Sequence, residues 1–217
     1  MEQEPLKKRK RQAMETRERI FNAAVELINE KGFENVQIED ISNKAYVSMG
    51  LFYKYFSNKA DIITEVFFSQ ISEQYQVIYD RHLIGKRGFR KIILFCHYIA
   101  ELHMLHEQRP QLRYHYSNIL STVNRGSWVT NGRRLLYTVL TQAVKEAKED
   151  GECPADTNET MAVGHIALMI RGAVFEYLLR EDADTSFNLI TAVDQLISHY
   201  LSGLKVRPVN LGVFDPY

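Results

Sequence analysis

The segment QIEDISNKAYVSMGLFYKYFSNK, from Gln37 to Lys59, constrains the fold of this chain more than any other stretch. Ile38, Ile41 and Ala45 recur at spacings of three and four, which predicts a short helix with one apolar face. Ser48 then offers a side-chain oxygen to the first turn of a second helix, as N-cap residues do. The segment therefore predicts two short helices joined by a sharp turn.

The second helix of this pair has one buried face and one free face. Phe52 and Phe56 are four residues apart, so both side chains point the same way, into a core. The other faces carry Met49, Tyr53, Lys54 and Tyr55. A helix-turn-helix needs this division, because its second helix packs on its own domain and also lies in the DNA major groove.

Residues 16–66 resemble the DNA-binding domain of the tetracycline-repressor (TetR) family. That family carries a pattern close to T-x-x-x-I-x-x-x-A-G-V-S-x-G-x-L/I-Y-x-Y-F-x-x-K-x-x-L. The matching positions here are Ile41, Ala45, Val47, Ser48, Gly50, Phe52, Tyr53, Tyr55, Phe56, Lys59 and Ile62. Two positions depart from the pattern. Tyr46 stands where the turn glycine is usual, which strains the turn if its φ is positive, and Leu51 replaces a small polar residue.

The resemblance implies that the second helix and its flanks contact DNA. The candidate DNA-binding residues are Ser48, Met49, Gly50, Leu51, Tyr53, Lys54, Tyr55, Lys59 and Arg17. Tyr53 is expected at a phosphate, and Lys54 at a guanine edge or a phosphate. Leu51 is expected to offer a thymine methyl contact in place of a polar one. Core packing is the alternative role for the two tyrosines.

Charge is distributed unevenly along the 217 residues, although the formal net charge is zero. Residues 7–11 form the consecutive basic run KKRKR. We expect residues 1–13 to be a flexible basic arm that follows the DNA backbone or enters the minor groove; a solvated tail is the alternative. The start of the chain lacks an apolar signal-peptide region, and no uninterrupted apolar twenty is present. A cytoplasmic, nucleoid-associated protein without a membrane segment is therefore expected.

The rest of the chain predicts an all-α protein. Apolar residues at helical spacing predict helices over residues 14–31, 58–82, 89–106, 110–124, 128–150, 157–180 and 184–204. We expect a three-helix DNA-binding domain at 14–60, a larger helical effector-binding and dimerisation domain at 61–205, and an irregular tail at 206–217. Cys96 and Cys153 lack CxxC spacing and are expected to be ordinary thiols, the first in the core.

The resemblance implies a ligand pocket in the second domain, lined by apolar and aromatic side chains with a few polar groups. The candidate lining residues are Phe67, Phe95, Tyr98, His103, Tyr116, Trp128, Tyr137 and Phe175. It also implies a homodimer built on the last two helices, because one protomer cannot bury all their apolar faces. The candidate interface residues are Gly164, Leu168, Gly172, Ala173, Val193, Ile197 and Tyr200.

The resemblance implies a ligand-responsive regulator, a repressor that binds a palindromic double-stranded operator as a homodimer. A small apolar or amphipathic effector is expected to release it, with no bound cofactor. A DNA-binding regulator or activator without an effector remains the alternative. The chain has no nucleophile elbow, phosphate loop or HExxH motif, so an enzyme is not expected. His97, His103 and His106 share one expected helix without partners at ligand spacing, so no metal site is expected.

Overall fold

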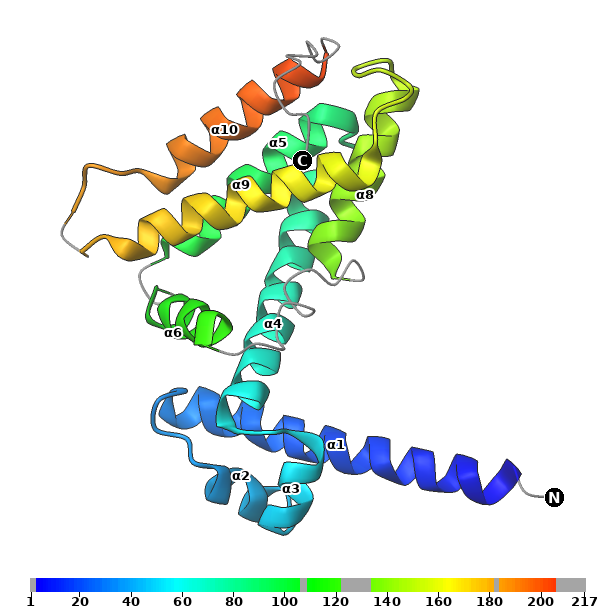
Figure 1. The fold of residues 1–217 in the computed structure, drawn as a ribbon, viewed down its shortest axis with the longest axis vertical. Coiled ribbons are helices and arrows are strands. Elements are labelled where there is room, and N and C mark those ends of the chain that lie inside the picture. Colours follow the sequence, from blue (N-terminus) through cyan, green and yellow to red (C-terminus); the bar gives the residue numbers. More distant parts are fainter. Residues whose placement is uncertain (1–2, 106–108, 122–133, 182–183, 206–217) are drawn as a thin grey trace, which may run out of the picture. The chain divides into compact units, whose positions relative to one another are not determined.

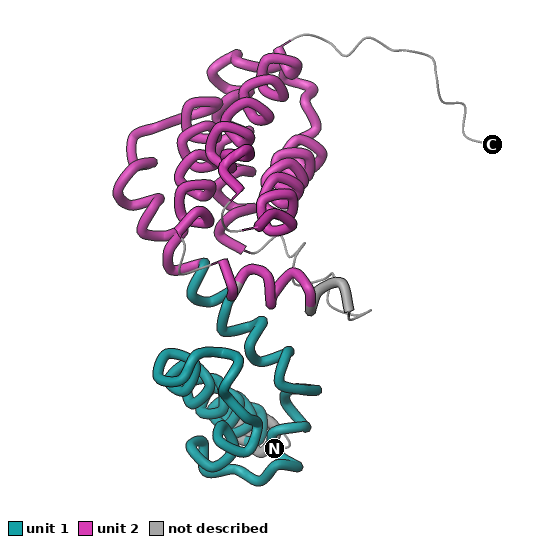
Figure 2. The backbone as a smooth tube through the Cα atoms, turned by 90° about the vertical axis from the view of Figure 1, so that its left-hand side faces the viewer, with its two compact units in different colours: residues 1–71 teal, residues 72–217 magenta. Residues whose placement is uncertain are grey.

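A computed structural model describes residues 3–105, 109–121, 134–181 and 184–205, and within these ranges it contains helices and no strand. The expected all-helical class is confirmed. The chain divides into two compact units, residues 1–71 and 72–217 (Figure 2). The boundary therefore lies inside the fourth helix, α4 (Lys59–Ile78), later than the expected boundary between residues 60 and 61.

The first unit contains α1 (Gln3–Lys31), α2 (Ile38–Lys44), α3 (Met49–Tyr55) and the first part of α4 (Figure 1). Its core is made by the predicted apolar stripe of α1, which is fully buried at Ile20 and Ala24. Gly32 ends α1 with a φ of 75°, the left-handed conformation that glycine adopts without strain. Phe33 then folds back into the core, as its position after the glycine predicts.

The first helix is longer than expected. It begins at Gln3, so residues 3–13, which the sequence analysis assigned to a flexible arm, continue α1 beyond α2 and α3 (Figure 1). Pro5 does not prevent this, because a proline in the first turn has no N–H that the helix needs. The lysines, arginines and glutamines that follow are good helix formers even without an apolar stripe.

The second unit is built on four helices packed in a closed ring. These are α5 (Gly88–Met104), α8 (Leu135–Glu149), α9 (Glu159–Leu179) and α10 (Leu189–Leu204). Helix α5 contacts α8 and α10, and both of these contact α9. The shorter α6 (Arg109–Ser121) packs on α5 and α9. Buried aliphatic side chains from all four main helices fill the centre of the ring.

Several boundaries differ from the expected ones. Helix α4 ends at Ile78 and continues as a π-helical turn, η1 (Tyr79–Leu83). Helix α10 begins at Leu189 rather than near position 184, because Asn188 caps it and accepts a 2.9 Å hydrogen bond from the Thr191 N–H. The expected helix starting at 128 is described only from Leu135, and the expected tail at 206–217 lies outside the described residues.

Helix α9 carries apolar residues on more than one face. Its length and its mean hydropathy of 1.4 over an 18-residue window would allow it to cross a membrane. The length and composition of α9 therefore do not confirm the expected absence of a membrane segment. Core helices of soluble proteins have the same character, and half of this window is buried inside the second unit.

Candidate functional site

The helix-turn-helix forms as its sequence predicts. The Ser48 Oγ accepts a 3.2 Å hydrogen bond from the Leu51 N–H and so caps α3. Phe52 and Phe56 are both buried and pack against each other, with ring centroids 5.7 Å apart. Tyr46 occupies the turn with a φ of 54°, so the position that is usually glycine is left-handed here too. The tyrosine side chain is 90% exposed, which leaves it free to accommodate that backbone.

One face of α3 is open to solvent. Tyr53 is 50% exposed, and its ring packs edge-on against Phe52 at 5.6 Å, so the core supports it from below. Lys54 and Gly50 are exposed, and a Cβ on that glycine would meet nothing closer than 4.0 Å. The remaining candidates divide between exposed Met49 and the half-buried Leu51 and Tyr55. The predicted division of α3 into two faces is therefore present.

Two of the candidate DNA contacts are engaged inside the unit instead. Arg17 forms a two-pronged ion pair with Glu65, at 2.8 and 2.5 Å, and lies 4.9 Å above the Phe56 ring. This arrangement fastens α4 to α1, and it corrects the expectation that Arg17 is free for phosphate. Lys59 donates to the Glu34 carbonyl oxygen at 2.8 Å, which directs its ammonium group toward the loop after α1.

The basic run extends the same unit. Arg9, Lys10 and Arg11 are exposed on the first turns of α1, and Arg11 pairs with Glu15 at 3.4 Å across one helical turn. Such an exposed pair contributes little to stability, so these side chains remain available for phosphate. A helix carries them, rather than the flexible arm that was expected.

The second unit gathers part of the predicted pocket set into a buried polar cluster. The Tyr75 hydroxyl lies 3.2 Å from the His103 Nε2, and the Tyr75 ring packs edge-on against Phe95 at 5.7 Å. Tyr75 and His103 are both buried. The His103 Nδ1 is buried and has no hydrogen-bond partner in the described part of the chain. Phe95 and His103 were predicted as pocket residues from the sequence, whereas Tyr75 was not.

Arginines from two helices join this cluster. Arg171 on α9 donates a 2.8 Å hydrogen bond to the Tyr137 hydroxyl on α8. Arg134, at the N-cap of α8, has a buried Nε and lies close enough to Tyr75, His103 and Arg171 to influence their electrostatics. Neither arginine was expected, although a charge inside the apolar sequence MIRGAV is a signal that points to Arg171.

Burial sets the protonation of the neutral members. Burial, together with the nearby positive charge of Arg134, lowers the pKa of His103 to about 4. Burial also raises the pKa of Tyr116 to about 12 and raises the pKa of Tyr75. The histidine and both tyrosines are therefore neutral at neutral pH.

Other predicted pocket residues lie elsewhere. Tyr98 stacks on His82 at 3.9 Å, beside an open groove of about 450 Å³ at the end of α4. Phe67 belongs to the first unit, and Trp128 lies outside the described residues. Tyr116 and Phe175 stack on each other, with ring centroids 6.2 Å apart.

The predicted dimer residues divide into two groups. Leu168 is 61% exposed, and Gly164 and Gly172 are also exposed on α9. Ala173, Val193 and Ile197 are buried inside the unit, so their assignment to a dimer interface is wrong: the ring of helices uses these side chains itself. Half-buried Tyr200 hydrogen-bonds through its hydroxyl with the His165 Nδ1 at 3.1 Å.

In the described ranges, no group of three or more His, Cys, Asp or Glu side chains is placed so that it could hold a metal ion. His97 approaches Asp194 at 2.9 Å and Glu101 at 3.7 Å. Cys96 and Cys153 are both buried free thiols, as expected.

Three comparisons place the chain among known proteins. Residues 20–66 match the family model "Bacterial regulatory proteins, tetR family". The HTH-type transcriptional regulator YdeS of Bacillus subtilis is 39% identical over 62 residues, which are 29% of this chain and 31% of that protein. That match spans less than a third of its length. SrpR of Pseudomonas putida, also an HTH-type transcriptional regulator, is 25% identical over 178 residues, 79% of each chain.

The fold is also found over nearly the whole chain. FadR of Thermus thermophilus, a TetR-family transcriptional repressor solved with lauroyl-CoA, superposes with a TM-score of 0.68 at 20% identity. The superposition covers 89% of this chain and 97% of FadR. The capped helix-turn-helix, the family model and the helical second unit agree. Residues 20–66 therefore carry the DNA-binding region of the TetR family of bacterial regulatory proteins, and nearly the whole chain shares the fold of a solved TetR-family regulator.

Proposed function

We propose that this protein is a repressor that binds a palindromic operator as a homodimer and leaves it when a small, partly apolar effector binds the second unit. The observation that carries the proposal is the exposed face of α3, where Tyr53 and Lys54 stand free on a helix that is capped by Ser48 and anchored by Phe52. A helix presented in this way fits a major groove.

A second copy of the chain would bury the exposed apolar side chains of α9 in a dimer interface. Met161, Leu168, Phe175 and Leu179 follow one another at spacings of seven, seven and four, and each is between 39% and 65% exposed. His165 and Glu176 are exposed on the same helix, which suits a protein partner better than lipid. A two-fold axis would pair two recognition helices with two operator half-sites.

Support for an apolar effector comes from the second unit and from one neighbour. FadR of Thermus thermophilus was solved with lauroyl-CoA, and the aromatic cluster around Tyr75 and Phe95 suits an acyl chain or an aromatic ring. Because α4 runs from one unit into the other, we expect its position to transmit the effector's presence. To shift the dimer from almost entirely DNA-binding to almost entirely released, the effector must bind the released conformation more tightly than the DNA-binding one by about 5.5 kcal/mol.

The test begins with selection of bound sequences from a pool of random DNA duplexes. We expect one palindromic sequence, bound by two chains, and weaker binding when lauroyl-CoA is added. A selected palindrome with unchanged affinity in lauroyl-CoA, in free fatty acids and in aromatic drugs would support the alternative, a regulator without an effector. Failure to enrich any sequence above the starting pool would refute operator binding itself.

A further inference from the structure

Tyr46 occupies the turn between α2 and α3 in a conformation that tyrosine rarely adopts. Its φ is 54°, and in the described part of the chain it is the only residue other than glycine with a positive φ. Crowding between Cβ and the backbone carbonyl disfavours this left-handed conformation for residues that carry a side chain, whereas glycine adopts it freely. The shape of the turn therefore does not account for a bulky aromatic residue at this position.

The Tyr46 side chain does not stabilise its own unit either. Backbone hydrogen bonds close the turn, from the Tyr46 N–H to the Asn43 carbonyl oxygen at 3.1 Å and from the Val47 N–H to the Ser42 carbonyl oxygen at 3.0 Å. The side chain itself is 90% exposed, and neither its hydroxyl nor its ring contacts a partner among the described residues. A strained backbone that carries an unused aromatic side chain points to a role in binding.

The turn places this tyrosine beside the surface that is proposed to meet DNA. Ser48 caps α3 only two residues later, and Ser48, Met49 and Gly50 are all exposed. In a helix-turn-helix, the first residues of the second helix contact base edges while the first helix crosses the phosphate backbone. The turn that joins the two helices is therefore expected at the edge of the major groove, beside the phosphates.

The chemistry of Tyr46 suits a phosphate at this edge. Lys44, two residues earlier, pairs with Glu26 and with Glu30, each at 3.0 Å, so the charge around this lysine is balanced by carboxylates. A phenol hydroxyl needs no balancing charge and donates one hydrogen bond, which a phosphate oxygen accepts. The turn thus offers a neutral donor where its neighbouring cation is compensated.

We propose that the Tyr46 hydroxyl donates a hydrogen bond to an operator phosphate at the edge of the groove that receives α3. This inference rests on the proposed function, because it adds a residue to the same DNA contact. The bond positions α3 without reading a base, so it strengthens binding to every sequence alike. A hydroxyl carries no charge and releases no counterion, which distinguishes this contact from one made by a lysine.

The first test removes the hydroxyl alone. Tyr46→Phe should weaken binding of the full-length protein to the selected palindrome by about ten- to a hundredfold, because the dimer loses two hydrogen bonds to charged oxygens. The loss should be the same at every salt concentration, as measured by fluorescence anisotropy. Tyr79→Phe in η1 removes a hydroxyl from the second unit and is the control. Equal affinity of Tyr46→Phe and the parent would overturn the proposal.

Ethylated phosphates then locate the contact on the DNA. Ethylation of one phosphate at the edge of each half-site should weaken binding of the parent. The same ethylation should have no further effect on Tyr46→Phe, because the hydrogen bond that it blocks is already absent. An identical pattern of interference in both proteins would overturn the phosphate assignment. Weaker binding of Tyr46→Phe only on duplexes with two adjacent palindromes would place the tyrosine between neighbouring dimers and would also overturn it.

A second substitution separates a DNA contact from a role in folding. Tyr46→Gly removes the side chain and relieves the left-handed strain, so it should be at least as stable as the parent and yet bind the palindrome no better than Tyr46→Phe. Tyr46→Ala keeps the strain and should unfold at a lower temperature than Tyr46→Gly. A Tyr46→Gly protein that loses thermal stability together with DNA affinity would give the tyrosine a structural role and overturn the proposal.

The parent protein distinguishes failure of this inference from failure of the proposed function. A parent that enriches no palindrome refutes operator binding, and the contact of Tyr46 with an operator is refuted with it. A parent that binds a palindrome no more tightly than Tyr46→Phe does retains the proposed function and refutes the tyrosine contact alone.

Discussion

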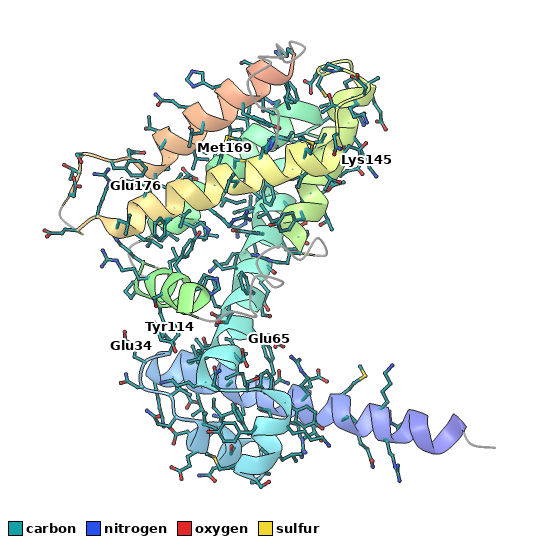
Figure 3. The ribbon with its side chains drawn as sticks, in the orientation of Figure 1. Glu34, Glu65, Tyr114, Lys145, Met169 and Glu176 are labelled. Atoms are coloured by element: carbon teal, nitrogen blue, oxygen red, sulfur yellow. The ribbon has the colours of Figure 1, made fainter. Side chains whose placement is uncertain are left out.

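Lys54 is the exposed cation of α3 that no described ion pair engages, and the first prediction concerns it. Lys54→Ala should weaken operator binding by about 1–3 kcal/mol if the ammonium reads a guanine, and should lower the salt slope by about one if it meets a phosphate. Lys145→Ala on α8 removes the same charge from the second unit and is the control (Figure 3). Equal DNA affinity for both variants at every salt concentration would contradict the proposed α3 contact. Fluorescence anisotropy with the selected duplex measures both quantities.

His103 gives a prediction about pH. Burial and the charge of Arg134 lower its folded pKa to about 4 from an ordinary 6.5. As pH falls below 6.5, the unfolded chain takes up a proton that the folded protein refuses, so stability is lost between about pH 6.5 and 4. The loss from this group approaches about 3 kcal/mol.

Removing the imidazole tests this directly. His103→Gln should flatten the plot of unfolding free energy against pH in that window, whatever its effect on stability at neutral pH. Urea unfolding at several pH values measures the slope, and exposed His199→Gln serves as the control. An unchanged slope in His103→Gln would mean that the folded protein does not hold this group neutral.

At the scale of elements, short-range sequence patterns predicted helix ends and helix faces. Contacts between residues far apart in the sequence were not predicted. The cap at Ser48 and the apolar spacing of α2 act within one turn of chain, and each was predicted. The Arg17–Glu65 ion pair joins residues 48 positions apart, which no periodicity reveals. The same holds for the two arginines of the buried cluster, whose surroundings come from five helices.

The start of α5 shows how a distant contact determines an element. The Gly88 N–H donates to the Glu146 carboxylate at 3.3 Å, and the Phe89 N–H donates to the Glu152 carboxylate at 2.6 Å. These acids had no predicted role, yet they satisfy backbone N–H donors that every helix leaves unpaired in its first turn. Lys91 pairs with Glu146 at 2.8 Å in the same buried place.

Gly88 should accordingly tolerate a side chain less well than Gly85. Its φ is 53°, and a Cβ there would collide with the Glu152 carboxylate. Gly85 has a φ of 75° but open space around it. Gly88→Ala should therefore destabilise the protein by about 1–3 kcal/mol more than Gly85→Ala, which carries backbone strain alone. Thermal unfolding of the two variants compares them, and equal midpoints would contradict the proposed capping role of the acids.

At the scale of the whole molecule, the exposed stripe of α9 determines how copies associate. Ala173 was predicted to lie in the interface, but it is 5% exposed, so a charge there would disrupt the protomer's own core. Leu168 is 61% exposed and can be changed without touching that core. A substitution at Ala173 would therefore affect folding of the protomer, whereas one at Leu168 would affect association of two copies. The sequence alone does not distinguish these two positions.

Leu168→Glu should leave the protomer folded and abolish the homodimer. A carboxylate buried in an apolar interface without a partner costs several kcal/mol, so the dissociation constant should rise by about a hundredfold or more. Light scattering gives the mass, circular dichroism verifies the fold, and Lys145→Glu on α8 provides a charge change of an exposed residue outside the stripe. The monomer should lose most of its affinity for a full palindrome but keep its weak affinity for a half-site, because only the pairing of two recognition helices is lost. A dimer that survives in both Leu168→Glu and Phe175→Glu would place the interface on another face of the second unit.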